Sequence, residues 1–311
     1  MKKHKIALIT LHFVLRQAYG KLRNQGGTMS LQPKQALVVE GGAMRGIFAA
    51  GVLDAFLEHK FNPFQFAIGV SAGSTNLIGY LAGNHGRSKK ILLDHARRAD
   101  FLNWRRYLKG GHFCDVSWLW HASFDEVPLD VAHYLKNGVP LFVVTTSITT
   151  GQACYFEVTE DNMHQLFPAS CAIPLAYRDF PLVNGDPMTD GGLADSVPVI
   201  KAYEMGARQI TVILSRPLGF RKRISKAPLL MKPLFKNHPA LFRAVVQRSE
   251  HYNQVLDFIE QPPADCSIHV IAPPADFKVG RFCQQPYVLE AGYQAGRSAG
   301  QKHLTKLKPP A

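Results

Sequence analysis

A serine stands between two glycines where residues 69–73 read Gly-Val-Ser-Ala-Gly. The pentapeptide follows a short apolar run at 66–68 and opens a stretch, 74–81, that predicts a helix. A Gly-x-Ser-x-Gly sequence between a strand and a helix is typical of a nucleophile elbow, a turn too sharp for bulky neighbours. The new helix directs its free N–H groups at the serine. Ser71 is therefore a candidate nucleophile, with Gly69 and Gly73 as elbow glycines.

A glycine-rich loop precedes the elbow. Residues 36–39 predict a buried strand, and Gly-Gly-Ala-Met-Arg-Gly at 41–46 separates it from a predicted helix at 47–59. Such a loop can turn its N–H groups inward as an oxyanion hole, or it can be a purely structural turn. A dinucleotide-binding loop is disfavoured, because Ala43 breaks the Gly-x-Gly-x-x-Gly pattern and no acidic ribose partner follows. The candidate hole residues are Gly41, Gly42, Ala43, Arg45, Gly46 and, after the nucleophile, Ala72.

These elements form a βαβα unit, which predicts a parallel sheet with helices on its faces. Further strands are predicted at 140–146, 210–214 and 268–271. The segment 94–130 reads as helices with loops and holds all three tryptophans, which either line an apolar pocket or, as we favour, pack on the flank of the sheet. The predicted fold class is α/β, a three-layer α/β/α sandwich with a mainly parallel central sheet, in one domain over 35–311.

A third element is Asp190-Gly191-Gly192, an acidic residue in a glycine turn that can present it at a loop tip. Together and in this order, the three elements resemble the patatin-like phospholipase family, which is marked by a Gly-Gly-x-x-Arg-Gly loop, a Gly-x-Ser-x-Gly elbow and an Asp-Gly-Gly or Asp-Gly-Ala turn. The segments 169–174 and 195–199 also fit. The likeness covers 36–215 and is nearest to the small stand-alone bacterial branch. Ala43 departs from a glycine common in the family, and the hole then requires a negative φ there.

The resemblance implies a serine esterase or lipid acyl hydrolase of the phospholipase A type, working through an acyl-enzyme with a Ser–Asp dyad. Ser71 attacks the ester carbonyl, and Asp190 accepts its proton and later activates water. The N–H groups of Gly42 and Ala43, with that of Ala72, hold the oxyanion, and Arg45 braces the loop. The resemblance implies no cofactor and no metal, and no acidic cluster has calcium-loop spacing.

Two other readings stay open. A Ser–His–Asp esterase would place its histidine downstream of the acid, where His238, His251 and His269 all lie. The second reading is a non-catalytic, membrane-associated lipid-binding protein with a decayed active site. Against it, Ser71 and Asp190 are both present with their flanking glycines.

The charge is unevenly distributed. The chain has 36 basic and 23 acidic residues, a net charge of +13, and 206–248 contains no Asp or Glu. Apolar residues interleave this stretch, in the excursion at about 217–242. That mixture suits an anionic membrane surface better than a nucleic-acid groove, although a solvated basic face is an equal alternative. We therefore expect a lipid or acyl-ester substrate, peripheral contact with anionic membrane and no nucleic acid.

The N-terminus and the cysteines bear on location. Residues 1–34 read as a leader, since a Lys-rich start precedes an apolar run at 6–15, or as a mis-assigned extension with translation starting at Met29. Five cysteines without paired spacing fit a reduced compartment. The expected location is the cytoplasm, peripheral to the inner face of the membrane.

Overall fold

The computed structural model describes residues 33–224 and 227–307. Its sheet has eight strands in the order β5-β6-β3-β2-β1-β7-β8, with β4 also paired to β3. Strands β8, β7, β1, β2 and β3 run parallel, and β4, β6 and β5 are antiparallel additions beyond β3. The predicted mainly parallel sheet is confirmed. The strands are β1 (Lys34–Val39), β2 (Phe66–Val70), β3 (Leu141–Ser147), β4 (Ala153–Glu157), β5 (Leu182–Val183), β6 (Asp186–Asp190), β7 (Ala207–Ile213) and β8 (Ser267–Ile271).

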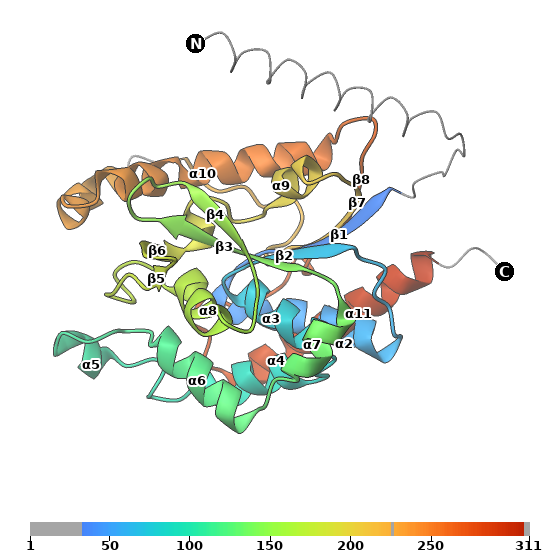
Figure 1. Cartoon of the computed structure of the whole chain (residues 1–311), viewed down its shortest axis with the longest axis horizontal. Coiled ribbons are helices and arrows are strands. Elements are labelled where there is room, and N and C mark those ends of the chain that lie inside the picture. Colours follow the sequence, from blue (N-terminus) through green and yellow to red (C-terminus); the bar gives the residue numbers. More distant parts are fainter. Residues whose placement is uncertain (1–32, 225–226, 308–311) are drawn as a thin grey trace, which may run out of the picture. The chain divides into compact units, whose positions relative to one another are not determined.

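Helices cover both faces of the sheet, which confirms the three-layer α/β/α class (Figure 1). Leu37 and Val39 of β1 pack on one side with residues of α2 and α3, whereas Ala36 and Val38 pack on the other with residues of α9 and α10. Because both faces are covered, the strand is apolar at every buried position, 36–39. The longer helices are α2 (Gly46–Glu58), α3 (Ala72–Leu81), α6 (Val116–Glu126), α8 (Met163–Cys171), α10 (Pro239–Glu260) and α11 (Pro286–Leu307).

Short helical segments fill the connections. A turn of π-helix, η2, continues α4, and η1, η3 and η4 are 3-10 turns. The short segments are η1 (Ala43–Arg45), α4 (Arg87–Lys90), η2 (Ile91–His95), α5 (Trp104–Leu108), α7 (Val131–Asn137), η3 (Gly191–Leu193), α9 (Val199–Glu204) and η4 (Ala227–Phe235). The prediction of helices with loops over 94–130 is confirmed by α5 and α6.

The predicted βαβα unit is present as β1, α2, β2 and α3, each within two residues of its expected start. The sequence analysis missed β4, β5 and β6. Asn184 and Gly185, with φ of 52° and 81°, form the tight turn that joins β5 to β6. Asp190 is consequently the last residue of a strand, not the tip of a loop.

The expected leader or mis-assigned extension at 1–34, with its alternative start at Met29, lies outside the described residues except for its last two positions. Over the described ranges, no helix combines the length and apolar character that a bilayer span requires.

Candidate active site

The nucleophile elbow lies at the end of β2. Ser71 follows β2 directly and precedes α3, with φ 51° and ψ −128°. A serine at positive φ is strained, and such strain at a strand-to-helix turn is typical of a catalytic nucleophile. The Ser71 N–H donates to Ser170 Oγ at 2.9 Å, and that hydroxyl donates to the Val144 carbonyl at 2.7 Å. These two hydrogen bonds fix the elbow against α8 and β3.

The elbow glycines are required by close backbone contacts. A Cβ at Gly69 would lie 2.5 Å from Ser74 Cα, and a Cβ at Gly73 would lie 2.4 Å from the Val39 carbonyl oxygen. Neither glycine has a positive φ, so space and not backbone conformation selects them. A larger residue at either position would displace the elbow from the ends of β1 and β2.

Strand pairing brings Asp190 beside the elbow. Strand β2 pairs with β3, and Thr145 of β3 pairs with Asp190 of β6. Gly191 and Gly192 begin η3, and the Gly192 N–H donates to the Asp190 carboxylate at 2.7 Å. Burial raises the pKa of Asp190, while the Gly192 N–H and the Ser71 hydroxyl act in the opposite direction. The carboxylate is therefore a stronger base than an exposed aspartate, and it lies next to the candidate nucleophile.

The glycine loop passes directly beside the elbow. A Cβ at Gly41 would lie 2.8 Å from the Val70 carbonyl oxygen and 3.1 Å from Ser71 Cβ. Within the described residues, the N–H groups of Gly41, Gly42 and Ala43 donate to no protein acceptor. These three donors are thus free to bind an anion that forms next to Ser71.

Ala43 does not have the negative φ that the sequence analysis required. Its φ is 50°, in the left-handed region, where an alanine costs about 1 kcal/mol more than a glycine. The negative φ on which the sequence analysis based the hole is therefore not met, because the loop turns here in a conformation that favours glycine. The Ala43 N–H nevertheless has no protein acceptor among the described residues, so it is still available as a donor. The family's usual glycine suits this backbone, and this chain carries a strained alanine in its place.

Gly46 and Ala72 begin the two helices that flank the site, α2 and α3. A Cβ at Gly46 would lie 3.1 Å from Ala72 Cβ, and Asn76 Nδ2 donates to the Gly46 carbonyl at 2.8 Å. The first turns of α2 and α3 therefore pack together, which holds the Ala72 N–H at a fixed distance from the glycine loop.

A buried polar cluster braces the glycine loop. Arg45 Nε and Nη2 donate to Ser215 Oγ at 3.3 and 3.2 Å, and that hydroxyl lies 3.2 Å from the Gly41 carbonyl oxygen. Glu40 accepts from the Ser215 N–H at 2.6 Å and from the Tyr252 hydroxyl at 3.2 Å. Burial lowers the pKa of Arg45 to about 10, so the guanidinium stays charged at neutral pH. Through Ser215, Arg45 is linked to the backbone of the glycine loop.

Sequence reasoning missed the partners that fix the loop and the elbow. Glu40, Ser170, Ser215 and Tyr252 come from segments far apart in the chain, and neither spacing nor composition links them. The one available signal was Ser170, which lies in the family-like segment 169–174.

Two cavities meet at Ser71. The first has a volume of about 100 Å³ and a mainly apolar lining that includes Leu92, Leu119, Trp120, Phe167 and Phe282. The second has a volume of about 450 Å³ and is lined by Asp190 and by several Arg and Lys side chains. Ala43, Ser71, Ile173 and Arg281 line both cavities. The candidate nucleophile thus lies where an apolar space adjoins a cationic one.

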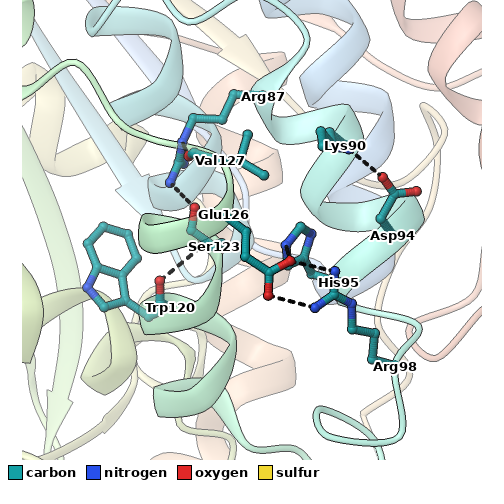
Figure 2. A network of polar contacts seen from close by, with 9 residues as sticks. All are labelled: Arg87, Lys90, Asp94, His95, Arg98, Trp120, Ser123, Glu126 and Val127. Atoms are coloured by element: carbon teal, nitrogen blue, oxygen red, sulfur yellow. Dashed lines mark hydrogen bonds and ion pairs between the residues drawn. The ribbon is translucent and has the colours of Figure 1, made fainter.

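Buried polar contacts hold the wall of the apolar cavity (Figure 2). Arg87 of α4 is buried and donates to the carbonyls of Val127 and Ser123, at 2.9 and 3.3 Å. His95 of η2 lies 3.1 Å from the Glu126 carboxylate, to which a nearby arginine also donates twice. These contacts join α4 and η2 to α6 and so fix the wall of the apolar cavity, to whose lining Arg87 and Ser123 themselves belong.

The tryptophans do not share one role. Trp120 belongs to the buried cluster under the sheet, lines the apolar cavity and stacks on Phe167 with ring centroids 4.5 Å apart. Both expected roles therefore meet in this residue. Trp104 is 64% exposed, so neither role applies to it.

The histidines considered for a triad lie elsewhere. Among the described residues that line the two cavities at Ser71, none is a histidine. His251 lines a third cavity, which adjoins the second at Arg248 and Tyr252 but does not include Ser71 or Asp190. The rings of His238 and His269 pack on Phe180 and His303.

Family profiles and curated proteins both match this chain. A family profile described as patatin-like phospholipase matches residues 37–203, and one described as a domain of unknown function (DUF6363) matches 238–309. The uncharacterized protein YjjU of Escherichia coli K12 is 30% identical over 91% of this chain and 86% of its own length. The probable lipid hydrolase 463L of Invertebrate iridescent virus 6 is 28% identical over 60% of this chain and 69% of its own length.

Two solved structures resemble the fold at low sequence identity. VipD from Legionella pneumophila aligns with a TM-score of 0.48 and 13% identity, over 88% of this chain and 67% of that chain. Human GIVD cytosolic phospholipase A2 aligns with a TM-score of 0.45 and 13% identity, over 88% of this chain and 58% of that chain.

Proposed function

Because this chain belongs to the patatin-like phospholipase family, a family of lipid hydrolases, we propose that it cleaves the carboxylic esters of lipids with Ser71 as nucleophile and Asp190 as base. One observation carries the assignment of these residues. A serine on a strained elbow and a buried carboxylate lie side by side where the apolar and the cationic cavity meet.

The first half-reaction forms an acyl-enzyme. Ser71 Oγ attacks the ester carbonyl carbon as Asp190 takes the hydroxyl proton. The negative charge on the carbonyl oxygen is held by the N–H groups of Gly42, Ala43 and Ala72, each lowering the barrier by about 3–4 kcal/mol. The intermediate collapses when the bond to the alcohol breaks, and Asp190 returns its proton to the leaving oxygen.

The second half-reaction releases the fatty acid. Water takes the place of the alcohol, and Asp190 removes a proton from it as it attacks the acyl carbon. The Ser71–acyl bond then breaks and the proton returns to Ser71 Oγ, so the enzyme is regenerated. Arg45 keeps the glycine loop in place through Ser215.

The apolar cavity suits the acyl chain. The cavity is lined by leucine, phenylalanine and tryptophan side chains. Transfer of methylene groups from water to this lining is favourable by about 0.8 kcal/mol for each fully buried CH₂. The absence of histidine among the described lining residues favours the dyad over a Ser–His–Asp triad. The intact pair of Ser71 and Asp190 favours an enzyme over a lipid-binding protein.

Labelling with alkyl fluorophosphonates tests this proposal. We expect one covalent adduct per chain, on Ser71, and faster labelling by a long-chain reagent than by its short-chain analogue, because only the long chain fills the apolar cavity. Peptide mass spectrometry locates the adduct. An unlabelled chain, or an adduct on another residue, would refute the assignment of the nucleophile, and equal rates for the two reagents would refute the acyl-chain site.

We also propose that η4 is a membrane contact. Leu230 and Leu234 are 84% and 62% exposed, and the exposed cations Lys232 and Lys236 lie beside them. Phe235, at the end of η4, is buried in a cluster with Leu193, which lines the cationic cavity. Apolar side chains next to lysines are typical of segments that bind anionic bilayers at their interface.

Replacing both Leu230 and Leu234 with glutamate is expected to weaken binding to phosphatidylglycerol vesicles by about tenfold or more, since two anchors are lost and two repulsive charges gained. Co-sedimentation measures the binding. Leu135→Glu, on the 51% exposed leucine of α7, is the matched control and should bind as the unmodified chain does. Equal binding by the η4 variant would rule out this contact.

A further inference from the structure

The basic stretch of the sequence does not simply face solvent. Arg221 is ion-paired with Asp257 and Glu260 of α10, at 2.6 Å each. Asn253 of α10 clamps the backbone of the next residue, accepting from the Lys222 N–H and donating to its carbonyl, both at 2.9 Å. The loop after β7 is thereby fastened to α10, which fixes Lys222 in the wall of the second cavity.

Cations from four separate segments line that second cavity. They come from η1, the loop after β7, α10 and the connection between β8 and α11: Arg45, Arg216, Arg221, Lys222, Arg223, Arg248 and Arg281. Among the described residues that line this cavity, Glu40 and Asp190 are the acidic ones. Glu40 is already hydrogen-bonded to Ser215 and Tyr252, and Asp190 to Gly192.

Several of these cations have no anionic partner. Within the described ranges, Arg216, Lys222, Arg248 and Arg281 form no ion pair. Lys222 Nζ lies 3.3 Å from Ser196 Oγ and 3.8 Å from the centroid of the Tyr252 ring. Burial and the nearby Arg248 lower the pKa of Lys222 to about 6, so an anion in the cavity is what favours its ammonium form at neutral pH. Partly buried cations that repel one another are costly to hold together unless an anion joins them.

We propose that the second cavity is a head-group site that selects anionic glycerophospholipids over zwitterionic ones, with Lys222, Arg216 and Arg248 as ligands of the phosphate. The proposal rests on the proposed function, since the cavity begins at Ser71 and Asp190. With the acyl chain in the apolar cavity, the rest of the lipid extends to the other side of Ser71. Guanidinium and ammonium groups bind phosphate strongly, and they repel the cationic end of a choline or ethanolamine head group.

The test compares two lipids with identical acyl chains, phosphatidylglycerol and phosphatidylcholine, in micelles of a non-ionic detergent, so that surface charge stays small. We expect kcat/KM to be at least about tenfold higher for phosphatidylglycerol, and Lys222→Met or Arg216→Met to reduce that ratio by about tenfold, the usual loss for a charged hydrogen bond. Lys302→Met, on an exposed residue of α11 that lines neither cavity, removes the same charge and should keep the ratio.

The outcomes separate this inference from the proposed function. Hydrolysis of a soluble p-nitrophenyl ester without any preference between the two phospholipids overturns the head-group site alone, as does a ratio that neither variant changes. An unmodified chain inactive on every ester refutes the proposed function itself. Titration calorimetry with inorganic phosphate tests whether the cavity binds free phosphate instead of a lipid head group. If phosphate binds tightly, Lys222→Met removes that binding and neither lipid is preferred, the cavity is a site for free phosphate and the head-group proposal is overturned.

Discussion

Replacing Ser71 with alanine is expected to lower kcat for a short-chain p-nitrophenyl ester by at least about 10⁴-fold, because the proposed acyl-enzyme forms on the Ser71 hydroxyl. The substitution removes only the side-chain hydroxyl group. The N–H groups of Gly42 and Ala43 remain, so we expect substrate binding and a slow residual hydrolysis to persist. Steady-state kinetics with purified protein measure the change. Ser298→Ala, on an exposed serine of α11, is the matched control and should keep full activity.

A glycine at position 71 separates catalysis from strain. Ser71 has a φ of 51°, which costs a non-glycine residue about 1–3 kcal/mol. Ser71→Gly should therefore be as inactive as Ser71→Ala and yet melt at a higher temperature than the alanine variant. Hydrolysis that survives both substitutions would show that the elbow is an ordinary turn, and the catalytic assignment would then be abandoned.

The fold could be predicted in its first half because local signals there agree. Continuous apolar runs at 36–39 and 66–68 are buried on both faces, and each is followed by glycines in close contact with other chain segments. The glycines after the first run approach Val70 and Ser215, and those after the second approach Ser74 and Val39. The hairpin of β5 and β6 was missed because β5 has only two residues. Its Asn184-Gly185 turn is a recognised hairpin signal that the sequence analysis did not use.

The C-terminal helix α11 shows a similar missed signal. Glycines recur every four residues at 292, 296 and 300, one above the other on a helix. A Cβ at Gly296 would lie 2.0 Å from the Phe48 carbonyl oxygen, and a Cβ at Gly300 would lie 2.9 Å from that of Val52. Because this stripe has no side chains, α11 packs directly on the backbone of α2. It thereby supports the helix that follows the glycine loop.

The candidate site also has one part that could be predicted from the sequence and one that could not. Ser71 and its glycines were predictable, since one short segment builds the elbow. The cationic cavity was not, because Arg45, Arg248 and Arg281 meet only through the packing of η1, α10 and the loop before α11. Net charge indicated an anionic partner, but only the fold places that charge beside Ser71, the candidate nucleophile.

Replacing Asp190 with asparagine is expected to lower kcat by about 10²–10⁴-fold, the usual contribution of a general base. Asparagine has nearly the same shape and can still accept from the Gly192 N–H, so the turn should keep its geometry. In the unmodified enzyme, burial raises the pKa of Asp190, so activity should fall with decreasing pH at a pKa above that of an exposed aspartate. The pH–kcat profile measures this. Asp195→Asn, which changes a buried carboxylate bonded to Tyr155, is the control and should retain the profile.

The same substitution should stabilise the fold, which distinguishes a functional carboxylate from a structural one. A raised pKa means that the folded state holds the Asp190 proton more tightly than the unfolded chain does, so this group favours folding at low pH and loses that contribution as pH rises through its folded pKa. Asparagine is neutral at every pH. We therefore expect Asp190→Asn to melt above the unmodified chain at pH 7 and close to it near pH 4. A variant that melts lower at pH 7 would show that the ionised carboxylate stabilises the turn, and burial would then not be what makes Asp190 basic enough to deprotonate Ser71.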